Sequence, residues 1–430
     1  MREMKDSGIE WIGAIPRAWE LNKIGAIYEE RNTKVSDLEY EPLSVTKQGI
    51  VPQLETAAKT DNGDNRKLIR KNDFVINSRS DRRGSCGISE YDGSCSLINT
   101  VLKPRGNTNN KYYSFVFKSD NFADEFYRWG HGIVNDLWST KWSDMKNIYI
   151  PSPTIDEQKR IADYLDKRCS RIDTIIEKQQ EIIEKLKEYK LSIISEAVTK
   201  GLKPDVEMKD SGAEFVGKIP NNWSVAKLGN LFDFIGGYAF NSDMYVPESN
   251  NQVVRIGNIK NGYMPLDSNP VYVSDETAEK ADRFLIKPGY ILFTMTGTKG
   301  KRDYFFTHVV SQKDCEEKRL YINQRVGCFV AKEGTCPDYY GYLLKDNRIL
   351  DGIFLYETGT ANQGNLGIDS ISRTKVHVPT YDEQVKISEY LGERCGAIDK
   401  SIEGRIAVVD KLTTYKKSLI YEVVTGKREV

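Results

Sequence analysis

The sequence predicts an α+β protein in which two α/β domains are separated by two long antiparallel helices that form a coiled coil. Two blocks of sequence each occur twice, two long stretches have helical apolar spacing, and the segments between them mix short β-rich runs with helical ones. The repeats also predict an internal pseudo-twofold relation. We divide the chain into a first domain, a central helix, a linker with the second domain, and a C-terminal helix, at residues 1–152, 153–200, 201–378 and 379–430.

The repeated blocks frame the two domains. In the first block, ten of sixteen positions match between residues 4–19 and residues 208–223, at an offset of 204. In the second block, ten positions match between residues 156–173 and residues 382–399, at an offset of 226. The sequence between the blocks is far less alike. The repeated blocks form a shared framework, and the domains between them have diverged. This pattern indicates a protein that recognises two different targets.

The composition is that of a globular chain. With 430 residues, of which 39% are apolar and 29% charged, each half is long enough to bury its own core. No apolar run is long enough to span a membrane and the first ten residues do not resemble a signal peptide, so we expect a cytoplasmic protein. Seven cysteines without a C-x-x-C pair predict reduced thiols rather than disulfides or a zinc site.

The formal net charge is zero, from 62 basic and 62 acidic side chains. A protein that held nucleic acid by neutralising phosphates alone would normally carry a basic excess. Three alternatives follow: the protein does not bind nucleic acid, its basic groups are local, or a partner supplies part of the charge.

Two long helices are predicted to begin at Thr154 and Thr380. Each threonine follows a proline and precedes a glutamate by three residues, which is the pattern of a capping box. Helical apolar spacing then continues for about 44 residues, or roughly 66 Å, to Gly201 and Gly426. We expect the helices to pair because each carries the apolar stripe that the other must cover. The stripe comprises Leu165, Cys169, Ile172, Ile176, Ile183, Leu186, Ile193 and Ala197 in the first helix, and Leu391, Cys395, Ile398, Ile402, Val409, Leu412, Leu419 and Val423 in the second.

Two positions on the stripe are polar in both copies. One holds Gln179 and Arg405, and the other holds Lys190 and Lys416. Gln179 and Arg405 lie near the middle of their helices, so in an antiparallel pair they should face one another and help to set the register. The alternative is that both side chains extend outward into solvent.

Weak echoes between the two domains predict a shared fold. Residues 68–76 match residues 285–293 in pattern, as a turn that leads into a buried strand, and residues 112–118 follow the pattern of residues 339–345. These echoes predict a repeated strand scaffold with loops that differ.

Two loops in each domain are candidate DNA contacts. Basic loops that contain glycine let guanidinium groups and backbone approach phosphates or base edges, and Asn or Gln amides can bond an adenine edge in bidentate fashion. Ordinary solvated turns are the alternative reading. The candidates are Arg79, Arg82, Arg83, His131 and Asn135 in the first domain, and Lys299, Lys301, Arg302, Thr360, Asn362 and Gln363 in the second.

Seven basic residues lie between Arg66 and Arg83, against Asp73 and Asp81. We interpret this run as a local basic excess that the zero total conceals, with a solvated charged face as the alternative.

A search for catalytic or metal-binding patterns finds none that we accept. The spacing G-x-x-x-x-G-K-[ST] of a phosphate-binding loop is absent, and the three histidines, His131, His308 and His377, stand far apart in sequence. We therefore predict no catalytic residue, no metal and no cofactor in this chain.

The order of these parts resembles the DNA specificity subunit of type I restriction-modification systems. The resemblance lies in Met4 to Gly13 with Ile15, Pro16 and Trp19, in the copy of this motif at 208–223, and in the Pro-Thr-x-Asp-Glu-Gln helix starts at 153 and 379. It covers the whole chain, and the doubled combination is highly specific.

The resemblance implies two target recognition domains that each read one half of a bipartite DNA site, and two helices that fix the distance between them. It implies a non-catalytic subunit that binds double-stranded DNA and docks two kinds of partner. Modification subunits would methylate adenine with S-adenosylmethionine, and restriction subunits would use ATP. The zero net charge is then reasonable because partners can neutralise much of the phosphate charge.

Two rival functions remain at this point. One is a non-enzymatic protein-binding scaffold with two paired domains on a coiled coil. The other is a nuclease or methyltransferase with a degenerate site. Salt-sensitive binding to duplex DNA would separate the first rival from the favoured function, and inertness of the purified chain with metal or methyl donor would exclude the second.

Overall fold

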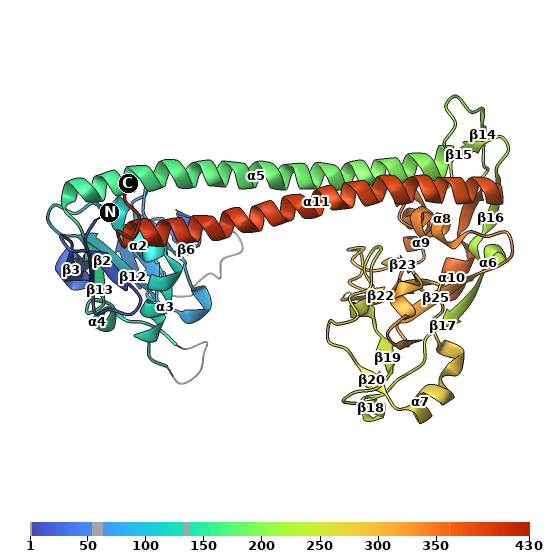
Figure 1. Cartoon of the computed structure of the whole chain (residues 1–430), viewed down its shortest axis with the longest axis horizontal. Helices are drawn as coiled ribbons and strands as arrows, with labels where there is room; N and C mark the ends of the chain where they lie inside the picture. The colour runs from blue at the N-terminus through green and yellow to red at the C-terminus, as the bar shows by residue number, and fades with distance from the viewer. Residues whose placement is uncertain (1, 54–62, 133–137, 361) are drawn as a thin grey trace. The chain divides into compact units, whose positions relative to one another are not determined.

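The computed structural model describes residues 2–53, 63–132, 138–360 and 362–430. The chain folds as two compact units, each of which combines a mixed α/β domain with parts of both long helices (Figure 1). Unit 1 comprises Met1–Glu181 and Arg405–Val430, and unit 2 comprises Ile182–Gly404. The predicted α+β class with two domains and two long helices is confirmed.

The two long helices are α5 (Ile155–Lys200) and α11 (Tyr381–Val424). Each is followed by a glycine with positive φ, 76° at Gly201 and 72° at Gly426, a backbone conformation that ends a helix and that other residues rarely adopt. Both helix ends therefore lie where the sequence predicts them.

Only one of the two predicted capping boxes forms. At the start of α11, the Thr380 hydroxyl accepts from the Glu383 amide at 3.4 Å and the Thr380 amide donates to the Glu383 carboxylate at 3.3 Å. At the start of α5, Glu157 instead accepts a 2.9 Å hydrogen bond from the Trp19 indole and pairs with Arg2. The prediction for Thr154 is wrong because an indole and a guanidinium compete for the glutamate.

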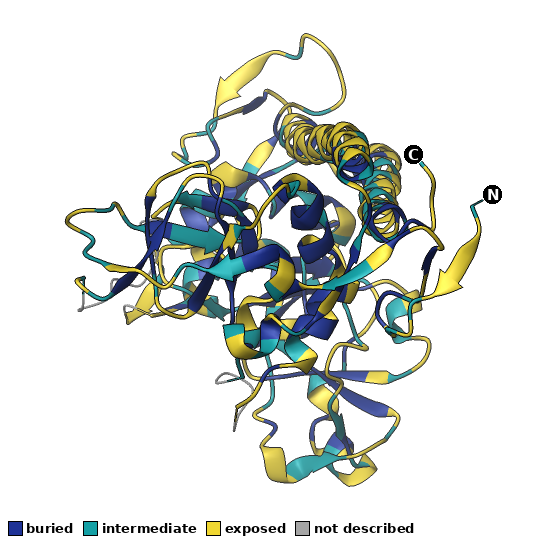
Figure 2. Cartoon of the chain, turned by 90° about the vertical axis from the view of Figure 1, so that its left-hand side faces the viewer, coloured by how far each residue is buried: buried dark blue, intermediate teal, exposed yellow. Residues whose placement is uncertain are grey.

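The helices pair antiparallel within each unit, and the residues of their apolar stripes are buried or half-buried. Leu165 and Leu391 are fully buried, and Ile172 and Ile398 nearly so, whereas the outward faces are exposed (Figure 2). In unit 1, Lys416 pairs with Asp173 at 2.6 Å. In unit 2, Lys190 pairs with Asp399 at 2.7 Å. These two ion pairs are copies of one another at the 226-residue offset.

The polar position at the middle of the stripe joins the two helices within unit 1. Arg405 Nη1 donates a 2.8 Å hydrogen bond to Gln179 Oε1. The two side chains therefore face one another and do not extend into solvent.

Unit 1 contains a four-stranded sheet of order β10-β9-β12-β4, a three-stranded sheet β11-β8-β5, and the two-stranded pairs β1-β2, β13-β3 and β6-β7. Its strands are β1 (Met4–Asp6), β2 (Ala14–Pro16), β3 (Glu20–Lys23), β4 (Tyr28–Glu30), β5 (Lys34–Val35), β6 (Leu43–Thr46), β7 (Gly49–Pro52), β8 (Arg66–Ile69), β9 (Phe74–Asn77), β10 (Cys86–Ile88), β11 (Gly93–Cys95), β12 (Asn99–Pro104) and β13 (Tyr149–Ser152). Its shorter helices are α1 (Ile24–Ile27), η1 (Ser80–Arg82), α2 (Asn110–Lys118), α3 (Asp120–Arg128) and α4 (Trp142–Met145).

Unit 2 contains two four-stranded sheets, β17-β25-β21-β23 and β18-β20-β19-β24, a small sheet β22-β27-β26, and the pairs β14-β15 and β16-β28. Its strands are β14 (Met208–Asp210), β15 (Lys218–Pro220), β16 (Ser224–Lys227), β17 (Phe232–Gly236), β18 (Tyr245–Val246), β19 (Asn251–Val254), β20 (Tyr272–Val273), β21 (Ile291–Thr294), β22 (Thr296–Gly297), β23 (Thr307–Val309), β24 (Arg319–Ile322), β25 (Val326–Ala331), β26 (Thr358–Thr360), β27 (Gln363–Asn365) and β28 (Lys375–Val378). Its shorter helices are α6 (Leu228–Leu231), η3 (Ser242–Met244), η4 (Ile256–Asn258), α7 (Asp275–Lys280), η5 (Asp282–Phe284), η6 (Lys313–Cys315), α8 (Pro337–Leu343), α9 (Asn347–Phe354) and α10 (Ile368–Arg373).

The main sheets of the two units have the same strand order. Strands β10, β9, β12 and β4 of unit 1 correspond in turn to β23, β21, β25 and β17 of unit 2. Ile76 lies opposite Thr100 in unit 1, and Phe293 lies opposite Gly327 in unit 2. A Cβ at position 327 would stand 2.2 Å from the Phe293 ring, so glycine is required beneath that ring.

One of the two sequence echoes forms helices rather than strands. Residues 68–76 and 285–293 end in the buried strands β9 and β21, as predicted. The tyrosine-rich echo instead forms α2 and α8, whose tyrosines Tyr112 and Tyr339 are fully buried. Tyr112 donates to the Val424 carbonyl at 2.9 Å, and Tyr339 donates to the Val198 carbonyl at 3.1 Å. This echo therefore marks the contact by which each domain holds the end of a long helix.

All seven cysteines are free thiols, and most of them are buried. In the described part of the chain, no helix combines the length and the apolar composition that a membrane span requires.

Candidate nucleic-acid interface

In unit 1, the two candidate loops meet where β9 ends. The Ser80 amide donates to the Trp138 carbonyl at 3.1 Å, and His131 and Ser139 exchange backbone hydrogen bonds of 3.0 and 3.1 Å. Ser139 is thus bridged on one side to Arg79 and on the other to His131. The basic loop and the histidine segment form one surface, although about fifty residues separate them in sequence.

Unit 2 repeats this arrangement at the end of β21. Strand β22 pairs with β27, and β27 pairs with β26, which joins the basic loop to the segment that contains Thr360 and Gln363. The Lys299 ammonium also donates to the Gly359 carbonyl at 3.0 Å. The structure therefore brings together the two loops that the sequence picked out separately.

The basic side chains of unit 1 differ in how freely they could meet a phosphate. Arg82 is the most exposed, and its nearest carboxylate is that of its neighbour Asp81 at 3.5 Å. Arg83 forms an ion pair with Asp124 and donates to the Asp120 carbonyl at 3.3 Å. Arg79 is half-buried. Arg82 is accordingly the best placed of the three for a phosphate contact.

In unit 2, Lys301 is exposed, and its ammonium makes no ion pair or hydrogen bond with the residues that the structure describes. Arg302 is already engaged, because it pairs with Asp351 at 2.6 Å and lies 5.6 Å from the centre of the Phe354 ring. Lys299 and Lys301 are therefore the available cations, and Arg302 holds the base of the loop.

Glu357 organises the loop that carries these lysines. Its carboxylate accepts from the Gly300 amide at 3.1 Å and from the Tyr304 hydroxyl at 2.7 Å. The pKa of Tyr304 is raised, first by burial and then by its hydrogen bond to Glu357. Asp303 accepts from the Thr298 amide at 2.7 Å, and the pKa of Asp303 is lowered by hydrogen bonds from Thr298. The sequence analysis did not predict a role for Glu357. Its hydrogen-bond partners lie about sixty residues away in sequence, and no local motif indicates such a contact.

The polar candidates of unit 2 lie at the tip of the β26-β27 hairpin. Thr360 lies opposite Gln363 in its register, and Thr360, Asn362 and Gln363 are exposed. In unit 1, His131 is exposed and lies 3.8 Å from Asp144. Asn135 lies outside the described residues.

The basic run from Arg66 is not the surface patch that the sequence suggested. Arg66 and Lys67 are buried, where Arg66 donates to Ser94 at 2.8 Å and Lys67 pairs with Glu30 at 3.0 Å. Arg70 pairs with Asp92 at 2.7 Å. Arg66, Lys67 and Arg70 are therefore already engaged, whereas Lys71, also part of this run, is exposed.

One polar surface of unit 2 was missed altogether. A pocket of about 420 Å³ is lined by Arg255 and by the turn Asn323-Gln324-Arg325, among other residues. The Met295 amide donates to the Arg325 carbonyl at 3.1 Å, so this turn adjoins the start of β22. The Arg255 Nε is buried without a hydrogen-bond partner. The Asn-Gln-Arg run between two β-rich segments is the sequence feature that could have indicated this polar surface.

Among the residues that the structure describes, no three His, Cys, Asp or Glu side chains gather as metal ligands. The buried cysteines are not activated, because burial raises the pKa of Cys86 and of Cys95 to about 12.

The arrangement of two diverged loop surfaces on a repeated framework matches one protein family. The model of the type I restriction modification DNA specificity domain matches residues 16–188 and 220–407, once over each half. The chain belongs to this family. The comparisons support a DNA-recognition subunit, rather than a protein-binding scaffold or an enzyme.

Individual relatives agree with this assignment. The chain is 27% identical over 290 residues to the type I restriction enzyme MjaVIII specificity subunit of Methanocaldococcus jannaschii, a match that covers 66% of this chain and 63% of the relative. It is 26% identical over 450 residues to the MjaX specificity subunit of the same archaeon, covering 97% and 96%. A solved structure described as the basis of complex assembly and conformational transition of the type I R-M system shares the fold, with a TM-score of 0.70, 14% identity, and 96% and 99% of the two chains covered.

Proposed function

We propose that this protein reads a bipartite, asymmetric site on double-stranded DNA, with one half-site for each unit. The observation that carries the proposal is the pairing of two candidate loops at the same end of the same sheet in both units, with different side chains on each surface. Equivalent positions with different chemistry are what two half-sites of different sequence require.

Within each surface, the residues divide into two roles. Arg82 in unit 1 and Lys299 and Lys301 in unit 2 neutralise phosphates and position the protein, because they are exposed cations. Asn362 and Gln363 in unit 2, and His131 in unit 1, reach base edges, since amides and imidazoles can both donate and accept. Arg79, Arg83, Arg302, Thr360 and Asn135 complete the candidate set.

The two long helices set the interval between the half-sites. Helix α5 runs unbroken from the part assigned to unit 1 into the part assigned to unit 2, and α11 does the same in the opposite direction. The Gln179–Arg405 hydrogen bond and the two copied Lys–Asp pairs fix their register. A fixed register implies a fixed spacer between the half-sites, on the order of one DNA turn.

Partners supply the chemistry. Modification subunits that methylate adenine with S-adenosylmethionine, and restriction subunits that use ATP, would dock on this chain and supply these cofactors. We also propose that the protein works in the cytoplasm, where its DNA target lies. Purified chain alone should neither cleave nor methylate DNA when metal or methyl donor is added, and activity of the chain alone would contradict this assignment.

Domain exchange tests the proposal. Residues 20–150 are replaced by the corresponding domain of another family member, and the methylated adenines of the host genome are mapped. One half of the recognised sequence should change while the other half and the spacer stay the same. A change in both halves would contradict independent reading by the two units.

Removal of one heptad from both α5 and α11 tests separately whether the helices set the spacer length. The tolerated spacer should become shorter, while both half-site sequences remain intact. If the spacer is unchanged, the helices do not set it.

A further inference from the structure

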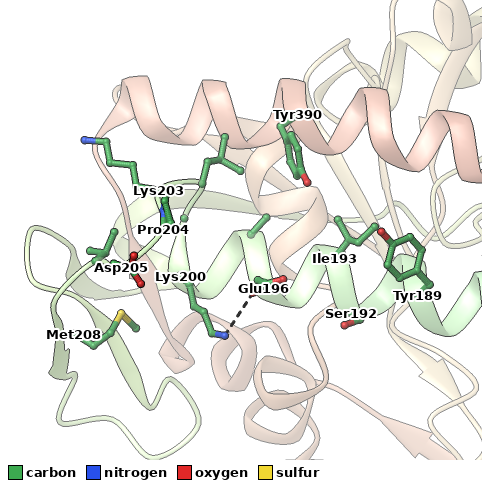
Figure 3. Close-up of a pocket in the computed structure, with 14 residues that line it drawn as sticks. Tyr189, Ser192, Ile193, Glu196, Lys200, Lys203, Pro204, Asp205, Met208 and Tyr390 are labelled. Carbon is green, nitrogen blue, oxygen red and sulfur yellow. Dashed lines mark ion pairs between the residues drawn. The ribbon is translucent and has the colours of Figure 1, made fainter.

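Unit 2 contains a pocket of about 720 Å³ beside the C-terminal end of α5. Tyr189, Ile193 and Glu196 line it along one face of α5, Tyr390 reaches toward it from α11, and the linker up to Met208 closes the far side (Figure 3). The pocket thus combines two aromatic rings, two carboxylates, two lysines and an apolar floor, and its charged side chains are Glu196, Asp205, Lys200 and Lys203. Nothing in the proposed DNA-reading role uses it.

The internal repeat places the same three polar side chains in unit 1. At the offset of 226 residues, Tyr189, Glu196 and Tyr390 correspond to Tyr415, Glu422 and Tyr164. These counterparts surround the guanidinium of Arg428. Arg428 Nη1 donates to the Tyr415 hydroxyl at 3.4 Å and lies 3.9 Å from the Glu422 carboxylate.

Further electrostatic contacts agree with this arrangement. The pKa of Arg428 is raised, first by its hydrogen bond to Tyr415 and then by charge interactions with Tyr415, Tyr164 and Glu422. In unit 1, therefore, all three copied side chains act on one guanidinium.

In unit 2, the Arg394 guanidinium lies 6.0 Å from the centre of the Tyr390 ring, but no described arginine of this unit pairs with Glu196. By alignment on the helix-ending glycines Gly201 and Gly426, the counterpart of Arg428 is Lys203. Its ammonium makes no ion pair or hydrogen bond with the described residues, because Pro204 and the positive φ of 56° at Asp205 turn the linker away toward β14. Figure 3 shows Lys203 pointing away from Glu196.

The Glu196 carboxylate of the pocket is only weakly engaged. Glu196 pairs with Lys200 one helical turn away at 3.6 Å, and both side chains are more than 60% exposed. An exposed pair of this kind contributes little and exchanges readily for a better partner. A planar guanidinium could bond the carboxylate and stack on the tyrosine rings at once, which an ammonium cannot do.

We propose that this pocket in unit 2 binds an arginine side chain presented by a partner protein. The aromatic and apolar rim favours a protein, since Tyr189, Leu202, Met208 and Tyr390 are all exposed large side chains around the Glu196 carboxylate. Exposed tyrosines that flank a charged site are typical of the residues that dominate protein interfaces. A nucleic acid is disfavoured because Glu196 and Asp205 offset the charges of Lys200 and Lys203, which leaves no basic excess for phosphates.

A small probe tests the chemistry without any partner. N-acetyl-arginine amide is titrated into the full chain labelled at the methionine methyls, with the lysine analogue as comparison. The Met208 methyl signal, assigned with Met208→Leu, should shift with the arginine probe and not with the lysine probe. Met4, the counterpart of Met208 in unit 1, serves as the internal control and should not move. Equal shifts with both probes would overturn the proposal.

A matched pair of variants tests the Glu196 carboxylate. Glu196→Gln should weaken binding of the arginine probe about tenfold, the loss expected for one charge-assisted hydrogen bond. Glu422→Gln makes the same change at the copied position in unit 1 and should leave the Met208 titration unchanged. If Glu196→Gln binds the probe as tightly as the wild type, the pocket does not recognise guanidinium.

The same two variants test the partner, and this step rests on the proposed function. In assembly with the modification subunits of the type I system, Glu196→Gln should bind about tenfold more weakly, while Glu422→Gln binds as the wild type does. If the wild type itself does not bind, the proposed function fails. If the wild type binds and Glu196→Gln binds equally well, only this inference fails.

A second copy of this chain is the alternative source of the arginine. Self-association of the purified chain, measured by sedimentation, should be the same for the wild type, Glu196→Gln and Arg428→Ala. Self-association that both variants abolish would assign the pocket to Arg428 of a second copy and overturn the assignment to a different protein.

Discussion

The main sheets of units 1 and 2 have the same strand order. The side chains that lie opposite one another on neighbouring strands nevertheless differ between the units. Unit 1 sets Ile76 against Thr100, and unit 2 sets Phe293 against Gly327. The backbone pairing is therefore the same in both units, whereas the side-chain packing differs: the larger phenylalanine of unit 2 lies opposite the smaller glycine. The comparison teaches that the main sheet is conserved in its backbone hydrogen bonds and not in its side-chain identities.

The units differ in the same way near the ends of the long helices. Strand β28 buries His377 against the Trp223 ring, with 5.7 Å between ring centres. At the corresponding place, β13 of unit 1 carries Pro151. Unit 2 therefore has a buried histidine where unit 1 has a proline, which gives the two units different responses to pH between 4 and 7.

The largest expected effect on stability comes from placing the threonine of unit 1, Thr100, at the corresponding glycine of unit 2, Gly327. Gly327→Thr should destabilise unit 2 by about 3 kcal/mol, because a side chain at this position collides with the Phe293 ring. Thr100→Gly in unit 1 creates no clash and should cost less, about 2 kcal/mol, from the loss of a buried side chain and the freer backbone. Hydrogen exchange of the β25 and β12 amides measures the two units separately.

A compensating change sharpens this test. Phe293→Ile in the Gly327→Thr background recreates the unit 1 pair and should recover most of the loss. If the double variant is no more stable than Gly327→Thr alone, the two sheets are not equivalent in packing.

The next effect is a pH dependence confined to unit 2. Burial lowers the pKa of His377 to about 4, below its ordinary value of 6.5. The unfolded chain therefore binds a proton at this histidine before the folded chain does, so the stability present above pH 6.5 falls as the pH is lowered toward 4. Between pH 7 and pH 5 the loss should be about 2 kcal/mol.

Urea unfolding followed through β28 amide exchange checks this expectation. His377→Phe, which keeps an aromatic ring against Trp223, should remove this part of the pH dependence. The same slope in His377→Phe and in the wild type would assign the effect to other groups.

Smaller effects are expected for the phosphate contacts. Arg82→Ala and Lys301→Ala each remove one exposed cation and should each lower the salt dependence of DNA binding by about one unit in a log–log plot, at a cost of about 1 kcal/mol. Arg302→Ala should change this slope less, because Arg302 already pairs with Asp351. Fluorescence anisotropy over a range of salt concentrations, in the assembled complex, measures the slopes.

Lys280→Ala, which removes an exposed lysine of α7 that pairs with Glu276, is the control and should leave the slope unchanged. An effect from only one of Arg82→Ala and Lys301→Ala would show that the two surfaces do not play equivalent roles.

The smallest effect should be the same in both units. Lys190→Met and Lys416→Met each remove one copy of the Lys–Asp pair between the long helices. These pairs are partly exposed, so each should cost about 0.5 kcal/mol. Thermal unfolding of the two single variants should give equal shifts, and a clear difference would break the pseudo-twofold equivalence of the helices.

Most of the framework was predictable because it repeats. The apolar stripe from Leu165 to Ala197 and its copy specify helices by period alone, and the glycines at 201 and 426 specify where they end. The capping box at Thr154 could not be judged in the same way. Its glutamate is taken by Trp19 and Arg2, a tertiary competition that no local pattern reveals.

The candidate interface was predictable in part. Loop chemistry selected Arg82, Lys301 and Gln363, which are exposed, but burial of Arg66 and Lys67 depends on sheet packing that charge patterns do not report. The pairing of the two loops in each unit, and the support of one loop by Glu357, join residues far apart in sequence. Such long-range pairings need coordinates, or an alignment that shows correlated change.

The exchange of Ile76 and Thr100 for Phe293 and Gly327 also limits how genes of this kind can recombine. Suppose that the coding sequences of the two domains recombine between the codons for the paired strands, β9 and β12 or β21 and β25. One product would then set phenylalanine against threonine, and the other would set isoleucine against glycine. The first product has a steric clash and the second a void. Viable hybrids should therefore exchange genetic material at the duplicated segments that flank each sheet, where more than half of the residues are the same in the two units.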